Sequence, residues 1–255
     1  MTICQDIMTF VEKIAPCELA EEWDNVGLLV GNRESRIEKI MLCLDITTTS
    51  VDEAVKENVD MIVTHHPVIF KGLKSLIDGE GKGSLLYTLI RNDINVYAAH
   101  TNLDFSESGV NTHLAAALGI KSLERLGEGP GKAGIPDKSI SLDDFIKQVK
   151  IDLDVPFVRV VGKTDGDVKK VAVFCGSFDD NLEVVRQSNV DVLVTGDLKY
   201  HTALEALEAG LCIIDAGHFN TEKVVLPALA NALEDNFPGI EVFCFLKEED
   251  PFKTY

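Results

Sequence analysis

The feature that most constrains the fold of this chain is an internal repeat. Residues Ile37–His66 and Val168–Asp197 follow one pattern at a constant offset of 131 positions. The first copy begins IEKIMLCL and continues to NVDMIVTHH, and the second begins VKKVAVFC and continues to NVDVLVTGD. The identical residues are Asn58, Val59, Asp60, Val63 and Thr64 in the first copy and Asn189, Val190, Asp191, Val194 and Thr195 in the second. Unrelated α/β units resemble one another by chance, but a constant offset over so long a stretch favours duplication.

Each copy is typical of a strand, a helix and a second strand. We expect strands at Lys39–Leu44, Met61–Thr64, Lys170–Cys175 and Val192–Thr195, with later strands at Phe157–Gly162 and Ile240–Phe245. We expect helices at Val51–Asn58, Gly83–Arg91, Gly109–Leu118, Ser141–Ile151, Leu182–Asn189, Leu198–Ala209 and Thr221–Leu233. The strands are continuous apolar runs that alternate with helices. This pattern predicts an α/β fold of two related domains, each with a mainly parallel sheet flanked by helices.

A Gly/Pro-rich stretch separates the two halves. Gly127–Pro136 reads GEGPGKAGIP, and we interpret it as a linker. The predicted domains are therefore residues 1–126 and residues 127–255, with the C-terminal helix and strand free to pack back on the first half.

Composition excludes several classes of function. No apolar run reaches the ~18 residues needed to span a membrane, and the amphipathic start of the chain is unlike a signal peptide, so we expect a soluble cytoplasmic protein. The six cysteines form no C-x-x-C pair, which favours free thiols. The formal net charge is −18 without a Lys/Arg cluster, which argues against direct nucleic acid binding. No phosphate-binding glycine motif and no serine nucleophile elbow occurs.

The chemically unusual residues follow the apolar strands. In parallel α/β sheets, ligands bind at the carboxyl ends of strands. His65-His66 ends MIVT, His100 and Asp104 follow NVYAA, Asp197 ends DVLVT, and His218 and Glu222 follow LCIID. The patterns around His100/Asp104 and His218/Glu222 are similar, which suggests one structural position used twice.

The pair His65-His66 is the sharpest of these signals. Neighbouring side chains in a strand point to opposite faces, so both imidazoles reach one site only if the strand has ended. Pro67 supports such an end, because it cannot continue the hydrogen-bond ladder. The alternative is one core histidine and one surface histidine.

The other positions are weaker when each is taken alone. The i, i+4 pair His218 and Glu222 is equally explained by the preference for Glu near a helix start, and Asp104 by a turn. Together with the paired histidines, they predict one metal site formed by His65, His66, Asp104, His218 and Glu222. Such mixed ligands suit Zn, Fe, Mn, Co or Ni. Five ligands exceed the need of one four-coordinate ion and favour two divalent ions.

Further residues remain open from the sequence. His100 is a sixth ligand, a proton shuttle or a partner of a ligand, and Asp197 and His201 are secondary candidates. His113 lies in an apolar helix and is interpreted as structural. Trp23, in Glu21-Glu22-Trp23-Asp24-Asn25, either lines a cleft or, as we expect, is a core anchor.

The combined motifs resemble the GTP cyclohydrolase I type 2 family, also called the NGG-one-interacting-factor-three-like family. The motifs are EEWDNVGLLVG, VTHHPVIF, YAAHTNLD, VLVTGDLKYH and DAGHFNTE, and they cover nearly the whole chain. The resemblance implies a dinuclear metal centre at His65, His66, Asp104, His218 and Glu222, with His100 close by. It also implies two related α/β domains and a homohexamer. One departure is the short loop Cys175-Gly176-Ser177-Phe178, where the family often has a longer Gly/Ser-rich loop.

Two hypotheses for the function follow. The first is a metal-dependent hydrolase, for which the resemblance implies a nucleotide substrate, GTP, whose purine ring is opened with release of formate. The second is a non-enzymatic metal-binding, regulatory or metal-handling protein that uses the same ligands. We identify no guanine-recognition motif and no bound organic cofactor from the sequence.

Overall fold

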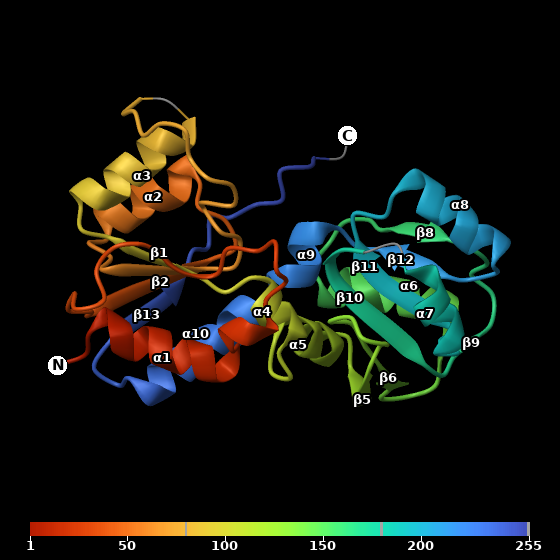
Figure 1. Ribbon diagram of the computed structural model, residues 1–255. Helices are drawn as coiled ribbons and strands as arrows, with labels where there is room; N and C mark the ends of the chain where they lie inside the picture. Colours follow the sequence, from red (N-terminus) through yellow and green to blue (C-terminus); the bar gives the residue numbers. More distant parts are fainter. Residues whose placement is uncertain (80, 179–180, 254–255) are drawn as a thin grey trace. The chain divides into compact units, whose positions relative to one another are not determined.

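The computed structural model describes residues 1–79, 81–178 and 181–253. It divides the chain into two compact units, each with its own sheet (Figure 1). Unit 1 comprises Met1–Ser106 and Leu226–Tyr255, and unit 2 comprises Glu107–Val225. The C-terminal helix and strand therefore belong with the first unit. The boundary at residues 126/127, drawn from the Gly/Pro-rich stretch, stays a prediction about the duplicated halves.

Unit 1 contains a five-stranded, mainly parallel sheet. Its strands are β1 (Gly27–Val30), β2 (Lys39–Cys43), β3 (Met61–Thr64), β4 (Asn95–Ala98) and β13 (Glu241–Cys244), in the order β1-β4-β3-β2-β13. Only β1, at one edge, is antiparallel to its neighbour. The helices are α1 (Cys4–Ile14), α2 (Thr48–Lys56), α3 (Gly81–Arg91), α4 (Thr101–Phe105) and α10 (Val225–Asn236), with a short 3-10 helix η1 (Cys17–Leu19).

Helices cover both faces of this sheet. In Figure 1, α2 and α3 lie on one face, and α1 and α10 lie on the other. The core under α2 and α3 includes Met41, Ile62 and Val96 from the three central strands. Across the other face, the Phe10 ring of α1 lies 5.5 Å from the ring of Phe237, which follows α10. Strands buried on both sides explain why the sequence shows apolar runs rather than alternation.

Unit 2 contains a six-stranded mixed sheet. Its strands are β5 (Ile120–Arg125), β6 (Lys132–Pro136), β8 (Arg159–Val161), β10 (Val171–Ser177), β11 (Val192–Gly196) and β12 (Ile213–Asp215), in the order β5-β6-β10-β11-β12-β8. The helices are α5 (Val110–Ala117), α6 (Leu142–Asp152), α7 (Leu182–Gln187), α8 (Tyr200–Glu208) and α9 (His218–Glu222). A small antiparallel pair, β7 (Ile140–Ser141) and β9 (Asp167–Val168), completes the unit.

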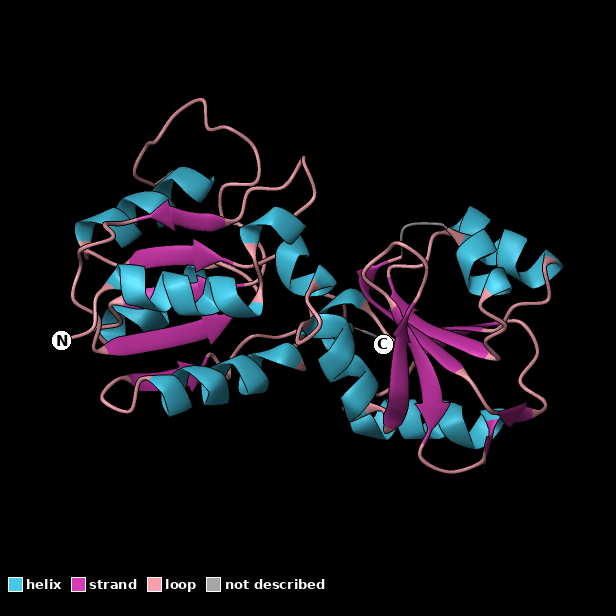
Figure 2. Cartoon of the chain, turned by 60° about the horizontal axis from the view of Figure 1, so that its bottom comes forward, coloured by secondary structure: helices cyan, strands magenta, loops and turns pink. Residues whose placement is uncertain are grey.

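The parallel part of this second sheet is its centre. β10, β11 and β12 are parallel, while β6 and β8 on either side are antiparallel to them. Figure 2 shows the helices packed around the strands of this unit. Residues of α7 and α8, including Val185 and Ala206, share one core with Ala172, Leu193 and Ile213 of the sheet. The α/β fold with helices flanking two sheets, predicted from the sequence, is confirmed. The prediction of a mainly parallel sheet in each half holds for unit 1 but not for unit 2, where three of the five strand pairings are antiparallel.

The repeat is visible in both topology and detail. In each unit, three parallel strands joined through helices lie in the same order, β4-β3-β2 and β12-β11-β10. The Asp60 carboxylate accepts hydrogen bonds from the backbone N–H groups of residues 38 and 39, each at 2.8 Å. The equivalent Asp191 accepts them from residues 169 and 170 at 2.7 and 2.8 Å. Asn58 and Asn189 share a left-handed backbone, with φ of 54° and 49°. The identical residues of the repeat thus perform identical local tasks.

The interpretation of 127–136 as a linker is wrong. Lys132–Pro136 forms β6, which pairs with β5 and with β10. Gly134 permits this pairing, because a Cβ there would lie 2.4 Å from the backbone oxygen of Lys121. The sequence misled because small residues here serve close strand approach rather than chain flexibility.

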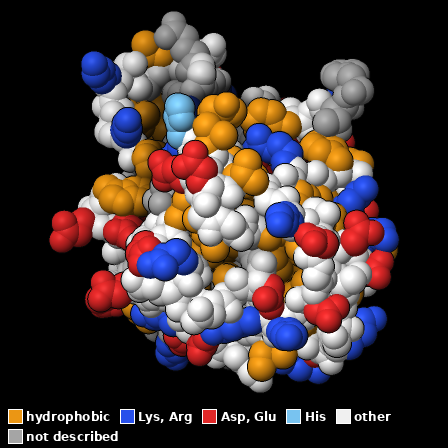
Figure 3. All heavy atoms as spheres, turned by 90° about the vertical axis from the view of Figure 1, so that its right-hand side faces the viewer, with side chains coloured by type: hydrophobic (Ala, Val, Ile, Leu, Met, Phe, Trp, Pro, Cys, Tyr) orange, Lys and Arg blue, Asp and Glu red, His pale blue; other side chains and the backbone are white. Residues whose placement is uncertain are grey.

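Two surface properties bear on function. None of the helices formed by residues 1–79, 81–178 and 181–253 has the length and apolar character of a bilayer-spanning segment. On the face shown in Figure 3, acidic and basic side chains are interspersed with apolar ones, so that face presents both signs of charge.

Candidate metal centre

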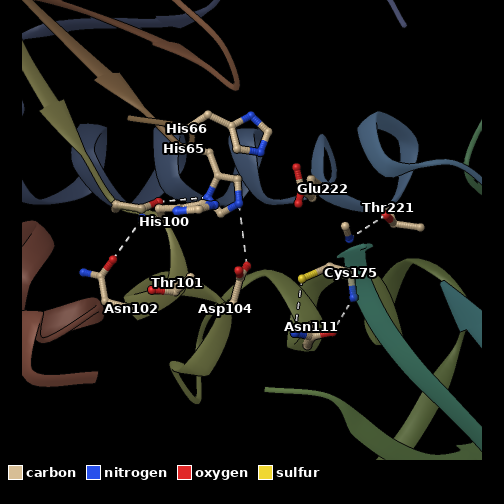
Figure 4. Close-up of polar contacts among 12 residues, drawn as sticks. His65, His66, His100, Thr101, Asn102, Asp104, Asn111, Cys175, Thr221 and Glu222 are labelled. Atoms are coloured by element: carbon tan, nitrogen blue, oxygen red, sulfur yellow. Dashed lines mark hydrogen bonds and ion pairs between the residues drawn. The ribbon is translucent and has the colours of Figure 1, made fainter. Parts of the chain in front are cut away.

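Four of the residues selected from the sequence gather at one edge of the unit 1 sheet. The ligand atoms that His65, His66 and His100 offer lie within 4.8 Å of one another. The Asp104 carboxylate oxygen Oδ1 lies 3.6 Å from His65 Nε2, and Figure 4 shows this carboxylate directed at the histidine. His65 is buried, with 2% of its surface exposed. Three imidazoles and a carboxylate at these separations form a site with metal-binding chemistry.

The paired histidines lie where β3 ends. The backbone N–H of His65 donates to Cys43 O at 3.2 Å, and that of His66 donates to Leu44 O at 2.8 Å. Pro67 follows and has no N–H to continue the pattern. The two imidazole rings lie 4.9 Å apart at an interplanar angle of 52°, so both belong to one cluster. The alternative of one core and one surface histidine does not describe this arrangement.

His100 and Asp104 reach the cluster through a tight turn after β4. His100 precedes the first residue of α4, and its backbone N–H donates to Asn102 Oδ1 at 2.9 Å (Figure 4). The backbone N–H of Asp104 donates to His100 O at 3.1 Å, which closes one helical turn. Residues four apart share a helix face. The turn therefore presents the imidazole and the carboxylate together.

Each of the three histidines has its Nδ1 atom held by an oxygen of unit 1. His65 Nδ1 lies 2.8 Å from Ala99 O, His66 Nδ1 lies 3.1 Å from Asp45 Oδ1, and His100 Nδ1 lies 2.9 Å from Asp24 Oδ1. A backbone carbonyl can only accept, so His65 carries its proton on Nδ1 and keeps the Nε2 lone pair for a ligand bond. Such contacts fix the tautomer and the ring orientation of metal-binding histidines.

Asp24 is a buried carboxylate that stays ionised. Burial by itself raises its pKa, but hydrogen bonds from His100 and Thr101 outweigh burial and hold the pKa below its usual range. The Thr101 hydroxyl donates to Asp24 Oδ2 at 2.5 Å and the Thr101 backbone N–H donates to the same oxygen at 3.1 Å. The ionised carboxylate holds the His100 ring in place through Nδ1 and leaves Nε2 directed away from Asp24.

Unit 2 carries a second, smaller group at the end of β12. His218 Nε2 lies 3.0 Å from Glu222 Oε1, and the two residues are the first and last of α9. Asp197 Oδ2 lies 2.9 Å from His218 Nδ1. Glu222 is almost fully buried, with 3% of its surface exposed. The helix predicted over 221–233 is in fact α9 and α10, and α9 begins early enough to include His218.

Glycines make room for this second group. Gly217, with φ of 89°, permits the turn from β12 into α9. A Cβ on Gly176 would lie 2.3 Å from Glu222 Oε1, and the Gly176 φ of 63° is itself left-handed. Its backbone N–H donates to Thr221 Oγ1 at 3.0 Å (Figure 4). The short loop after Cys175 therefore serves to accommodate and hold the Glu222 segment.

The remaining sequence candidates have other surroundings. His201 is exposed and its ring contacts that of Tyr200 at 5.4 Å. Burial lowers the pKa of His113, which fits its interpretation as a structural residue. The expectation that Trp23 anchors the core is wrong, because 57% of its surface is exposed.

Sequence reasoning named Asp24 and Gly176 only within longer segments and did not select Asp45, so it missed their places beside His100, Glu222 and His66. Asp45 follows β2 at its carboxyl end, so the strand-end argument that selected His65 also selects it. Gly176 is the repeat equivalent of Asp45, at the same offset of 131 positions. Asp24 lies in an irregular segment, where no period or spacing pointed to His100.

Comparisons with known proteins agree with these features. Residues 2–251 match the family described as Duf34/NIF3 (NGG1p interacting factor 3). A Clostridium perfringens protein named GTP cyclohydrolase 1 type 2 homolog is 36% identical, over 97% of this chain and 98% of its own. A Clostridium acetobutylicum protein of the same name is 35% identical, over 90% of this chain and 89% of its own.

Solved structures show the same similarity. The crystal structure of a Bacillus cereus protein related to NIF3 matches with a TM-score of 0.93 and 26% identity, over 100% of this chain and 99% of that one. The family match covers nearly the entire sequence, including every candidate ligand. This chain belongs to the Duf34/NIF3 (NGG1p interacting factor 3) family.

Proposed function

We propose that this protein is a metal-dependent hydrolase with a dinuclear centre of divalent ions. The proposed ligands are those predicted from the sequence: His65, His66, Asp104, His218 and Glu222. The observation that carries the proposal is the cluster in unit 1, where His65 and His66 are each oriented through Nδ1 and the Asp104 carboxylate lies 3.6 Å from His65 Nε2. The pair His218 and Glu222 repeats this chemistry in unit 2.

The donor set fits a transition metal or zinc rather than calcium. Imidazole nitrogens and one or two carboxylates suit Zn, Fe, Mn, Co or Ni. When bound, such ions lower the pKa of water and polarise a substrate oxygen. His65 is preset for ligation through Nε2, because its Nδ1 proton is donated to Ala99 O.

His100 is the residue we assign to proton transfer. Its Nδ1 atom lies 2.9 Å from the carboxylate of Asp24, which stays ionised. An ionised carboxylate behind an imidazole stabilises the imidazolium that forms when the ring accepts a proton. His100 then takes a proton at Nε2 during attack of water and returns it to the leaving group.

The proposed substrate is GTP, on the strength of the names of the relatives. One water adds at the carbon between the two imidazole nitrogens of the purine ring and one C–N bond breaks, which leaves a formamide on the opened ring. A second water cleaves the remaining C–N bond, and that carbon leaves as formate. Two relatives that cover most of this chain are each named GTP cyclohydrolase 1 type 2 homolog.

The first experiment is metal analysis of protein purified without added metal. We expect bound divalent metal in the wild type and its loss in the double variant His65→Ala/His66→Ala. His100→Gln serves as the matched control and should retain the metal but lose turnover of GTP to formate. Unchanged metal content in the double variant contradicts the assignment of ligands.

A second variant tests whether both groups of ligands serve one centre. We expect His218→Ala to weaken metal binding measured at the unit 1 ligands, for example by cobalt absorption spectra. If the two groups are independent, the cobalt spectrum due to His65 and His66 stays unchanged in His218→Ala, and a shared centre is excluded.

Turnover separates the two functions considered from the sequence. Formate release from GTP by the metal-loaded wild type, absent in His100→Gln, supports the hydrolase. Tight metal binding without formate release assigns the chain to the non-enzymatic metal-binding alternative. We further propose a homohexamer, as the family resemblance implies, for which native mass spectrometry should give six times the chain mass of 27.9 kDa.

A further inference from the structure

Trp23 is exposed to solvent and yet firmly held. Its exposed fraction is 57%, but the residues around it are tied to the body of unit 1. The backbone N–H of Glu21 donates to Thr101 Oγ1 at 3.0 Å, and the carboxylate of Asp24 bonds His100. The side chain of Asn25 donates to Ile69 O at 2.5 Å. A single exposed apolar side chain is ordinary on a protein surface, so a binding role for Trp23 depends on the residues beside it.

A second exposed ring stands beside it. Phe70 is 40% exposed, and its ring centroid lies 5.7 Å from that of Trp23 at an interplanar angle of 56°. The bond from Asn25 to Ile69 ties together the two segments that carry these rings. The pair is therefore a defined surface rather than two independent side chains.

This pair borders the histidine cluster. The ring of His100 lies 6.1 Å from Trp23 and 6.3 Å from Phe70. The same imidazole lies 5.2 Å from His65 and 5.4 Å from His66. A flat molecule that stacks on Trp23 or Phe70 is thus next to the proton-transfer residue that we assign and one ring away from two candidate ligands.

We propose that Trp23 and Phe70 form a stacking surface that binds the planar, nitrogen-containing aromatic ring of the substrate. This inference rests on the proposed function and assigns the residues that bind the aromatic base of its substrate. Aromatic side chains bind such rings face to face without hydrogen-bond readout. That mode explains how a chain with no guanine-recognition motif places a purine beside its metal ligands.

Charged side chains of both signs flank the two rings. Lys71 and Lys74 follow Phe70 and are exposed, in a chain whose net charge is −18. The lysines follow Phe70, whereas Glu21 and Glu22 precede Trp23 and are exposed as well, so a phosphate on the same ligand is suited by the Phe70 segment only. We therefore expect GTP to bind more tightly than guanosine, by a margin that shrinks as salt is added.

The chain offers its own reporter, because Trp23 is its single tryptophan. Metal-loaded protein is titrated with guanosine, GTP and, as a ligand without an aromatic ring, ribose 5-phosphate. We expect guanosine and GTP to quench the tryptophan emission and ribose 5-phosphate to leave it unchanged. For variants that lack Trp23, the affinities are measured by calorimetry instead of fluorescence.

Substitutions assign the binding to the two rings. Trp23→Leu and Phe70→Leu should each weaken guanosine binding on the order of 10- to 100-fold, the range for loss of one stacking partner. Metal content should stay at the wild-type value in both. Tyr200→Leu is the matched control, since Tyr200 is an exposed ring in contact with a histidine on α8, and it should bind guanosine like the wild type.

The outcomes separate this inference from the proposed function. Guanosine binding that depends on Trp23, without formate release from GTP, supports the stacking surface and contradicts GTP hydrolysis. Formate release with an unchanged KM in both ring variants overturns the stacking surface and leaves the hydrolase standing. Tryptophan quenching that depends on protein concentration and not on ligand concentration also overturns the stacking surface, because the two rings then contact a second copy of the chain.

Discussion

Substitution of Gly176 by alanine tests the architecture around Glu222. The new Cβ would lie 2.3 Å from Glu222 Oε1 and 3.4 Å from His218 Nε2. Ordinary van der Waals contact needs about 3.5 Å, so the carboxylate must retreat by about 1 Å. Glu222 is buried, and the adjacent Thr221 is bonded to the Gly176 backbone, so the retreat reorients the carboxylate.

Two costs follow, and they have different magnitudes. The left-handed φ of 63° at Gly176 costs an alanine roughly 1–2 kcal/mol of stability. Displacement of the carboxylate should reduce metal affinity by about 10- to 100-fold, as expected when a ligand loses its support. Gly210→Ala separates the two costs, because Gly210 has a similar φ of 70° with nothing within 4 Å of its added Cβ.

The assay measures both quantities on the same preparations. Urea unfolding of metal-free protein gives the free energy of unfolding, and competition with a chelator gives the metal affinity. We expect both alanine variants to lose similar stability and only Gly176→Ala to lose metal affinity. Wild-type metal affinity in Gly176→Ala would refute the placement of Glu222 as a ligand held against this loop.

Three further predictions concern stability. Burial lowers the pKa of His113, so the unfolded chain binds a proton at this residue more readily than the folded chain does. In urea unfolding of metal-free protein, the free energy of unfolding should therefore hold above pH ~6.5 and fall as the pH drops below it. His113→Leu should reduce this dependence on pH. Lys132 is 3% exposed and bonded to Glu107, so Glu107→Gln should cost about 1 kcal/mol in the same assay; no change contradicts a role for the pair. Asp60→Ala and Asp191→Ala each remove an acceptor of two backbone N–H groups and should destabilise by similar amounts, about 1 kcal/mol; calorimetric melting that shifts in only one contradicts their equivalence.

The sequence pattern alone predicted those helices and strands in which the apolar residues recur at a single period. The strand Met61–Thr64 has the predicted bounds, and the helices α3, α5 and α6 lie within one or two residues of theirs. In these segments, the spacing of the apolar residues, together with the length of the segment, favours one type of secondary structure. The prediction for 127–136 failed because β6 is a short inner strand rich in small residues and shows no apolar period, and one of its two partners, β10, lies far along the sequence.

The ends of the predicted strands identified the candidate ligands from the sequence alone. His65 and His66 follow a strand of the unit 1 sheet and His218 follows a strand of the unit 2 sheet, and within each sheet the parallel strands end at one edge. The partners that orient them were harder to find. Asp45 had the same signal, but Asp24 reaches His100 from an irregular segment 76 positions away. Such a contact depends on the path of the chain in space and leaves no trace in local spacing.

By itself, the sequence determined the α/β class, the duplicated strand–helix–strand unit and the identity of the candidate metal ligands, because these depend on residue type and on spacing along the chain. The tertiary structure decided which oxygen contacts each imidazole, and it placed Glu222 so close to position 176 that only a glycine fits there. It also decided that Trp23 faces solvent rather than the core. Those features arise from contacts between segments distant in sequence, and only a folded chain brings them together.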